Sequence, residues 1–353
     1  MTIIGFATRG LFASFLCLLI AVNGFTGPAY AQAEAPSFRI VDTEWMDDMR
    51  ARNVPVRLYW PSDITPDMRI PLVVFSHGIG GSRQGYSYLG RYWAARGIAS
   101  LHVQHVGSDS SLWAANPLTL VQRLQLAAHE SEALARAADV RFALDRMLSP
   151  ETGSYSTVID RHRIIVAGHS YGANTALVSV GAGVMRRGGW VDAKDPRFAA
   201  AIVISSPPFY GETDLAAVLK NVTVPTLHVT TTDDVIRIPG YYSPATDRIG
   251  VYNAVAGPRK MIAVFQGGSH NSFTDRTSSR GQNLNAYVKT ATAELTLAFM
   301  DVIFRGNQFE MMRWKTKWQA IVALPPDVAA IQRPLAEEAS ANRKTRASVK
   351  ALQ

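Results

Sequence analysis

Short apolar runs, rich in β-branched residues, alternate along the chain with longer stretches in which apolar residues recur at helical spacing. The short runs predict eight strands, at 38–41, 54–59, 72–76, 98–105, 163–167, 201–205, 226–230 and 260–265. Helical spacing predicts helices over 82–95, over 118–148, from Tyr171 onward, and over 283–304. The pattern therefore predicts an α/β fold, with a mostly parallel eight-stranded sheet flanked by helices on both faces. The first two strands have no helix between them and predict an antiparallel hairpin at the sheet edge.

The first 31 residues have the pattern of a secretory signal peptide. Arg9 is the only charge among residues 1–33, and an apolar run over 11–22 precedes Ala29-Tyr30-Ala31. A short basic region, an apolar run and an A-x-A site are typical of cleavage during export. The run is shorter than the roughly 20 residues that span a bilayer, so an uncleaved anchor is the weaker alternative. We expect a mature chain beginning near Gln32, periplasmic or secreted.

Composition narrows the chemistry. The single cysteine, Cys17, lies in the N-terminal apolar run, which excludes disulfides and cysteine-based sites from the rest of the chain. The formal charge is +8, and residues 305–353 carry nine Lys or Arg against four Asp or Glu. We therefore expect a domain over 32–304 and a basic C-terminal extension over 305–353. This distribution does not indicate nucleic acid, and the extension predicts at most weak contact with an anionic surface.

A serine motif follows the fifth predicted strand. Residues 168–172 read Gly-His-Ser-Tyr-Gly, after an apolar strand and before an Ala-rich helix. In that setting G-x-S-x-G forms a tight elbow that exposes the serine at the N-terminus of a helix. This context predicts Ser170 as a nucleophile, whereas the motif alone could be an idle glycine-rich turn.

A second loop supplies candidate donors for an oxyanion. Residues 76–82 read Ser-His-Gly-Ile-Gly-Gly-Ser after the third predicted strand. Acyl transfer needs two preorganised N–H groups, one from the residue after the nucleophile and one from such a loop. We expect the backbone N–H groups of Tyr171 and Ile79 in these roles, with His77 bracing the loop.

Two further loops supply a candidate acid and base. Asp233 and Asp234 follow the strand at 226–230, and His270 follows the strand at 260–265, in the order that Ser-Asp-His hydrolases use. His270 is the expected base, and the residues alone leave the acid open between the two aspartates. His102 and His105 lie three apart on a strand and so face opposite sides, which argues against a shared metal ion. No metal and no organic cofactor is implied.

These motifs together resemble the α/β-hydrolase superfamily. Within it the chain resembles the dienelactone-hydrolase-like group, related to platelet-activating-factor acetylhydrolase and bacterial polyester hydrolases. The similarity rests on residues 54–61, 75–82, 105–109, 168–173 and 268–270, and spans about 38–304. True dienelactone hydrolases carry cysteine in the elbow, where this chain has Ser170. The spacing in relatives selects Asp234 as the acid.

The resemblance and the motifs predict a secreted serine hydrolase that cleaves carboxylic esters through an acyl-enzyme. Its partner would be a small-molecule or lipid-like ester, and not a nucleic acid. Two alternative functions are compatible with the same sequence. One is a peptidase or amidase on the same three residues, and the other is a non-catalytic binding protein on a hydrolase scaffold.

Overall fold

The computed structural model describes residues 38–114, 116–238, 241–276 and 282–327. Contacts divide the chain after Ala35, and the described residues all belong to the unit 36–353. The proposed signal peptide, 1–31, lies outside the described residues. Within the described ranges no helix is both long and apolar enough to cross a membrane.

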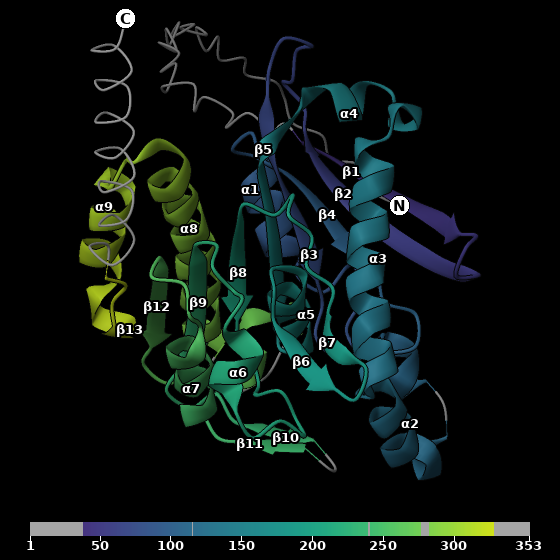
Figure 1. Ribbon diagram of the computed structural model, residues 1–353. Helices are drawn as coiled ribbons and strands as arrows, with labels where there is room; N and C mark the ends of the chain where they lie inside the picture. Colours follow the sequence, from purple (N-terminus) through teal and green to yellow (C-terminus); the bar gives the residue numbers. More distant parts are fainter. Residues whose placement is uncertain (1–37, 115, 239–240, 277–281, 328–353) are drawn as a thin grey trace, which may run out of the picture. The chain divides into compact units, whose positions relative to one another are not determined.

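One nine-stranded sheet organises the described chain (Figure 1). Its strands, in spatial order, are β1 (Phe38–Asp47), β2 (Arg52–Pro61), β4 (Ala99–Val103), β3 (Ile70–Ser76), β5 (Ile159–His169), β8 (Ala200–Ile204), β9 (Thr226–Thr231), β12 (Lys260–Phe265) and β13 (Val322–Leu324). The six strands from β4 to β12 run parallel, and β1, β2 and β13 are antiparallel to their neighbours. All eight expected strands are present, and the first two form the expected edge hairpin.

Helices cover both faces of the sheet. Their bounds are α1 (Ser87–Ala94), α2 (Leu120–Ala127), α3 (Glu130–Leu148), α4 (Ser154–Val158), α5 (Tyr171–Ser179), α6 (Leu215–Leu219), α7 (Thr246–Ala254), α8 (Gln282–Arg305) and α9 (Phe309–Trp318). Two small hairpins, β6 (Gly183–Arg186) with β7 (Gly189–Asp192) and β10 (Ile236–Ile238) with β11 (Tyr241–Ser243), stand apart from the main sheet.

Alternate side chains of the central strands enter two separate cores. On β3, Leu72 and Val74 pack on the face covered by α3 and α5, while Val73 and Phe75 pack on the face covered by α1, α8 and α9. This period of two, with apolar residues on both faces, is what a buried parallel strand requires. The cores hold the carboxyl ends of the central strands at one edge of the sheet.

The structure differs from expectation at the C-terminal side of the domain. Helix α9 packs Met311, Trp314 and Trp318 into the core under α8, and β13 adds a ninth strand antiparallel to β12. Residues 305–327, expected as the start of a solvated extension, are therefore folded onto the sheet. The sequence pattern did not predict these two elements, because β13 is only three residues long and α9 carries Arg313, Lys315 and Lys317 on its more exposed side. Residues 328–353 lie outside the described part of the chain.

Candidate active site

Ser170 lies at the sharp turn from β5 into α5. Its φ of 57° and ψ of −125° fall in a region that non-glycine residues rarely occupy. A Cβ at position 168 would lie 2.1 Å from the Gly172 carbonyl oxygen, and one at 172 would lie 2.0 Å from the Ser76 carbonyl oxygen. Only glycine fits at these two positions, so the elbow motif of the sequence is a steric requirement of this turn.

Three side chains from the loops at the ends of three parallel strands meet at this turn. His270 Nε2 lies 2.8 Å from Ser170 Oγ, and His270 Nδ1 lies 2.7 Å from Asp234 Oδ1. The residues follow β5, β9 and β12, which run parallel in one sheet and therefore end at the same edge. With Asp234 ionised, the Nδ1–H donates to the carboxylate and leaves Nε2 to accept the Ser170 hydroxyl proton.

Asp234 is completely buried and surrounded by donors. Thr230 Oγ1 donates to its Oδ2 at 2.8 Å, Ser205 Oγ donates to the same oxygen, and Arg248 Nε lies 3.4 Å from Oδ1. Burial alone raises the pKa of Asp234, but His270, Arg248 and Ser205 together hold it below its ordinary value. The neighbouring Asp233 is exposed and accepts from Thr232 Oγ1 at 3.1 Å.

The loop after β3 faces the serine. Gly78 N–H donates to Tyr86 Oη at 3.2 Å, Gly80 N–H to the Ser108 carbonyl at 2.8 Å, and Gly81 N–H to the Gly78 carbonyl at 2.9 Å. Within the described chain no protein acceptor takes the Ile79 N–H. Tyr171 is the first residue of α5, so its N–H has no acceptor inside the helix.

His77 holds this loop by two hydrogen bonds. Its Nε2 accepts the His105 N–H at 3.1 Å, so the proton is on Nδ1, which donates to the Gly78 carbonyl at 2.7 Å. That carbonyl belongs to the same peptide as the Ile79 N–H. Burial, and then Arg136, lowers the pKa of His77 well below 6.5, which keeps it neutral.

A hydrogen-bonded relay links the loop to the base. Tyr86 Oη, which accepts the Gly78 N–H, donates to His169 Nδ1 at 2.9 Å, and His169 Nε2–H donates to the His270 carbonyl at 3.0 Å. Burial raises the pKa of Tyr86 to about 12 and lowers that of His169 well below 6.5. Both groups therefore stay neutral and hold the two loops at a fixed distance.

Behind the loop lies a buried polar network. Arg136 donates to the Ser76 hydroxyl at 3.1 Å and to the His77 carbonyl, and its guanidinium stacks over the Tyr171 ring at 4.5 Å. His105 joins Ser76 at 2.9 Å to Asp139 at 3.0 Å and is fully buried. His105 therefore braces the loop and does not line a cavity. Among the described residues no three His, Cys, Asp or Glu side chains are placed to hold a metal ion.

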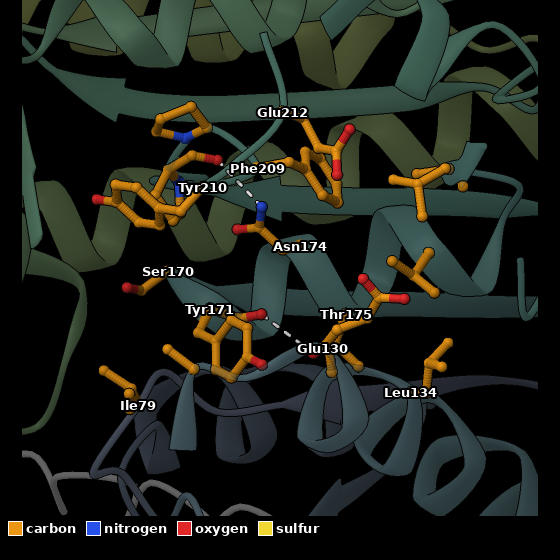
Figure 2. Close-up of a pocket in the computed structure, with 18 of the residues that line it drawn as sticks. Ile79, Glu130, Leu134, Ser170, Tyr171, Asn174, Thr175, Phe209, Tyr210 and Glu212 are labelled. Carbon is orange, nitrogen blue, oxygen red and sulfur yellow. Dashed lines mark hydrogen bonds between the residues drawn. The ribbon is translucent and has the colours of Figure 1, made fainter. Parts of the chain in front are cut away.

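Two cavities meet at Ser170. One, of about 180 Å³, has mainly apolar walls that include Leu134, Val178 and Phe209 (Figure 2). The other, of about 820 Å³, has mixed walls, more polar than those of the first cavity, and they include Asp275 and Arg276 beside His270. Of the aromatic residues in nearby loops, Phe209 and Tyr241 line the apolar cavity, Trp113 lines the more polar one, and Tyr242 is exposed.

Comparisons with known proteins relate the chain to one family of hydrolases. The profile of the family "Platelet-activating factor acetylhydrolase, isoform II" matches residues 36–135. Platelet-activating factor acetylhydrolase from Cavia porcellus is 22% identical over 262 residues, 65% of this chain and 54% of that protein. The chain has the α/β-hydrolase fold and is similar to that family over residues 36–135. It spans about half the length of this curated relative.

Solved structures show that this chain shares its fold with both peptidases and esterases. An acylaminoacyl peptidase from Pyrococcus horikoshii superposes with a TM-score of 0.53 at 18% identity, over 75% of this chain and 41% of that one. A ferulic acid esterase from Streptomyces cinnamoneus superposes with a TM-score of 0.50 at 22% identity, over 75% of this chain and 88% of that one. At these identities the likeness establishes the fold alone.

The structure adds contacts that the sequence did not indicate. Arg248, Ser205 and Thr230 surround Asp234, and Tyr86 links two loops that are far apart in the chain. No local motif marks any of these residues. The sequence indicated the role of Arg136 only weakly. An arginine among the alanines and leucines of a helix can be buried only where it has polar partners.

Proposed function

We propose that the protein is a serine carboxylic ester hydrolase that works through an acyl-enzyme on Ser170. The observation that carries this proposal is the contact of Ser170 Oγ with His270 Nε2 at 2.8 Å, beside a loop with an unused N–H at Ile79. Sequence similarity to an acetylhydrolase family supports ester cleavage as the reaction.

In acylation, Ser170 Oγ attacks the ester carbonyl carbon while its proton passes to His270 Nε2. The carbonyl oxygen becomes an oxyanion and accepts hydrogen bonds from the Ile79 and Tyr171 N–H groups. The imidazolium then formed is stabilised by ionised Asp234, which also fixes the tautomer. Collapse of the intermediate breaks the carbon–oxygen bond to the alcohol, which leaves with the proton from His270.

Deacylation repeats these steps with water. His270 Nε2 accepts a proton from a water molecule as the water oxygen attacks the acyl-enzyme carbonyl. The second intermediate expels Ser170 Oγ, which recovers its proton from the imidazolium, and a carboxylic acid is released. The apolar cavity suits the acyl group, and the more polar cavity suits the departing alcohol.

A Ser170→Ala variant tests the proposal. Loss of a triad serine lowers kcat by up to about 10⁶, so hydrolysis of p-nitrophenyl butanoate should fall to background. A fluorophosphonate probe should label the wild type and not the variant. Retention of a tenth of wild-type activity would exclude Ser170 as the nucleophile, and an unlabelled wild type would indicate a non-catalytic scaffold. Faster turnover of butanoyl p-nitroanilide than of the ester would favour an amidase on the same triad.

We further propose that the protein is exported, on the strength of the pattern in residues 1–31. N-terminal sequencing of protein recovered from the periplasm or medium should begin at Gln32. An exported chain that retains Met1 would contradict cleavage.

A further inference from the structure

The apolar cavity runs beside α5 from the nucleophile to the other end of that helix. Ser170, Asn174 and Val178 line it on successive turns, and eight residues of α-helix rise about 12 Å. The start of α3 and the β6–β7 hairpin line it as well. Figure 2 shows Ser170 at the left of the cavity, with Glu130, Glu212 and Leu134 to its right.

Part of the cavity wall away from Ser170 is an ion cluster. Arg186 Nη2 lies 2.6 Å from Glu130 Oε2 and 2.7 Å from Glu212 Oε1, and Arg186 Nε lies 3.0 Å from the same Glu130 oxygen. The hydrogen bonds that Arg186 donates to Glu130, and then to Glu212, raise the pKa of Arg186, which is therefore charged. The three residues come from α3, β6 and the loop before α6, and all three line the cavity.

The cluster carries a net negative charge. Two carboxylates, those of Glu130 and Glu212, face one guanidinium, while Asp192 lines the cavity at the other end of the hairpin, opposite Gly183. The other walls include Leu134, Val178 and Phe209. The cavity thus combines apolar walls with one charged region.

We propose that the Arg186–Glu130–Glu212 cluster is the end wall of the acyl site and determines which acyl groups this enzyme accepts. The inference rests on the proposed function. An acyl chain that fits the apolar part buries its methylenes favourably, whereas a longer one must place methylenes against charged groups and strip their water. The cavity volume, about 180 Å³, is near that of a cavity of about 150 Å³ that holds benzene, which suits one aromatic ring or a short alkyl chain.

The same wall opposes acyl groups that end in a carboxylate. A terminal carboxylate would meet two carboxylates, with the one guanidinium already paired to both of them. Arg186 and Glu130 are each about 40% exposed, so solvent screens the repulsion between like charges here without removing it. We therefore expect neutral acyl groups to be favoured over carboxylate-ended ones of the same length.

Chain-length selectivity tests the proposal. The ratio of kcat/KM for p-nitrophenyl decanoate to that for p-nitrophenyl butanoate would be measured in wild type, Arg186→Ala and Glu212→Gln. Arg186→Ala opens the wall, and we expect this ratio to rise about tenfold or more, the scale of a few methylenes in a pocket. Glu212→Gln keeps the volume but loosens the pair, so a smaller rise is expected. Arg146→Ala breaks a similar exposed ion pair, to Glu151 at 2.6 Å, which is not part of the cavity, and should leave the ratio unchanged.

A second pair of substrates tests the effect of a charge at the end of the acyl chain separately from the effect of chain length. Wild type should prefer p-nitrophenyl pentanoate to the p-nitrophenyl monoester of glutaric acid, and the double variant Glu130→Gln with Glu212→Gln should reduce that preference about tenfold. Unchanged selectivity for both pairs in folded variants that still hydrolyse butanoate would overturn the end wall and leave the proposed function standing. A wild type that hydrolyses no ester, or does so without Ser170, would overturn the proposed function and this inference with it.

Discussion

Two adjacent aspartates after β9 have opposite surroundings. Asp234 is buried and contacts His270, Thr230 and Ser205, whereas Asp233 is exposed and contacts a threonine hydroxyl. Successive residues of an extended chain point to opposite sides, so only one of the pair can reach the imidazole. The residues alone left the choice open, because the packing that separates them comes from β8 and α7.

The aspartates should therefore respond differently to the same substitution. Asp234→Asn removes the charge that stabilises the imidazolium and favours the wrong tautomer, which costs about 10⁴ in kcat in a Ser-His-Asp enzyme. Asp233→Asn should cost less than about tenfold, as an exposed substitution away from the reacting atoms. Ester kinetics on both variants, with folding checked by circular dichroism, decide the matter. A larger defect at Asp233 would contradict this assignment.

At the scale of elements, Tyr86 ties α1 to the active site. Tyr86→Phe leaves the Gly78 N–H and His169 Nδ1 buried without their partner, which costs about 1–3 kcal/mol of stability for each such group. We also expect kcat to fall, since the loop that carries Ile79 loses a fixed contact. Denaturant unfolding and ester kinetics measure the two effects.

Tyr88, two residues along, provides the matched control. Its hydroxyl is buried and has no hydrogen-bond partner among the described residues. Tyr88→Phe therefore removes an unsatisfied polar atom and should leave stability unchanged or raise it. Equal losses in the two variants would show that the Tyr86 hydrogen bonds have no special role.

The C-terminal helix provides the second test at this scale. Trp314 is 3% exposed, lies in the core under α8 and donates its indole N–H to the Ala291 carbonyl at 2.7 Å. Trp314→Ala should cost about 3–5 kcal/mol of unfolding free energy, the usual range for a buried large aromatic. Phe309, on the same helix, is 56% exposed, and Phe309→Ala should change stability by less than about 0.5 kcal/mol. Similar losses would mean that α9 does not belong to the core.

The elements that the sequence predicted share a strong periodic signal, and those it did not predict are short or interrupted. The central strands are buried on both faces and appear as unbroken apolar runs. The predicted helix over 118–148 is instead α2 and α3, because His129 is extended and its Nδ1 caps α3 by accepting the Ser131 N–H. Hairpin β6–β7 has strands of four residues, and its only sequence signal is the Gly188-Gly189 turn.

At the scale of the whole molecule, the chain order of Ser170, Asp234 and His270 sufficed to place them at one sheet edge. The order of the three residues and their positions at strand ends can be read from the sequence. Because parallel strands end at the same edge of the sheet, these positions bring the three side chains close together. The walls of the apolar cavity could not be predicted in this way. Glu130, Arg186 and Glu212 come from three elements whose contact depends on tertiary packing, so no local pattern could identify them.

Five buried histidines make the whole fold sensitive to acid. Burial lowers the pKa of His77, His105 and His169 well below 6.5, and that of His102 and His228 to about 3. The unfolded chain takes up these protons below about pH 6.5, while the folded chain resists them. Between those values the unfolded state binds more protons, so stability is complete above pH 6.5 and falls as the pH is lowered.

His228 isolates one contribution to this effect. It is 3% exposed on β9, beside the Tyr252 ring at 5.3 Å, and takes no part in the proposed chemistry. His228→Leu removes the titrating group and keeps an apolar side chain in the core. Going from pH 7 to pH 5, a histidine with a folded pKa of about 3 and an unfolded pKa of 6.5 loses roughly 2 kcal/mol of stabilisation. The variant should therefore lose about 2 kcal/mol less than wild type over that range, measured by urea unfolding. His162→Leu, at an exposed position, should follow the wild-type curve. If the His228→Leu and wild-type curves run parallel from pH 7 to pH 5, then His228 accepts its proton in the folded state, and its burial is not a source of acid sensitivity.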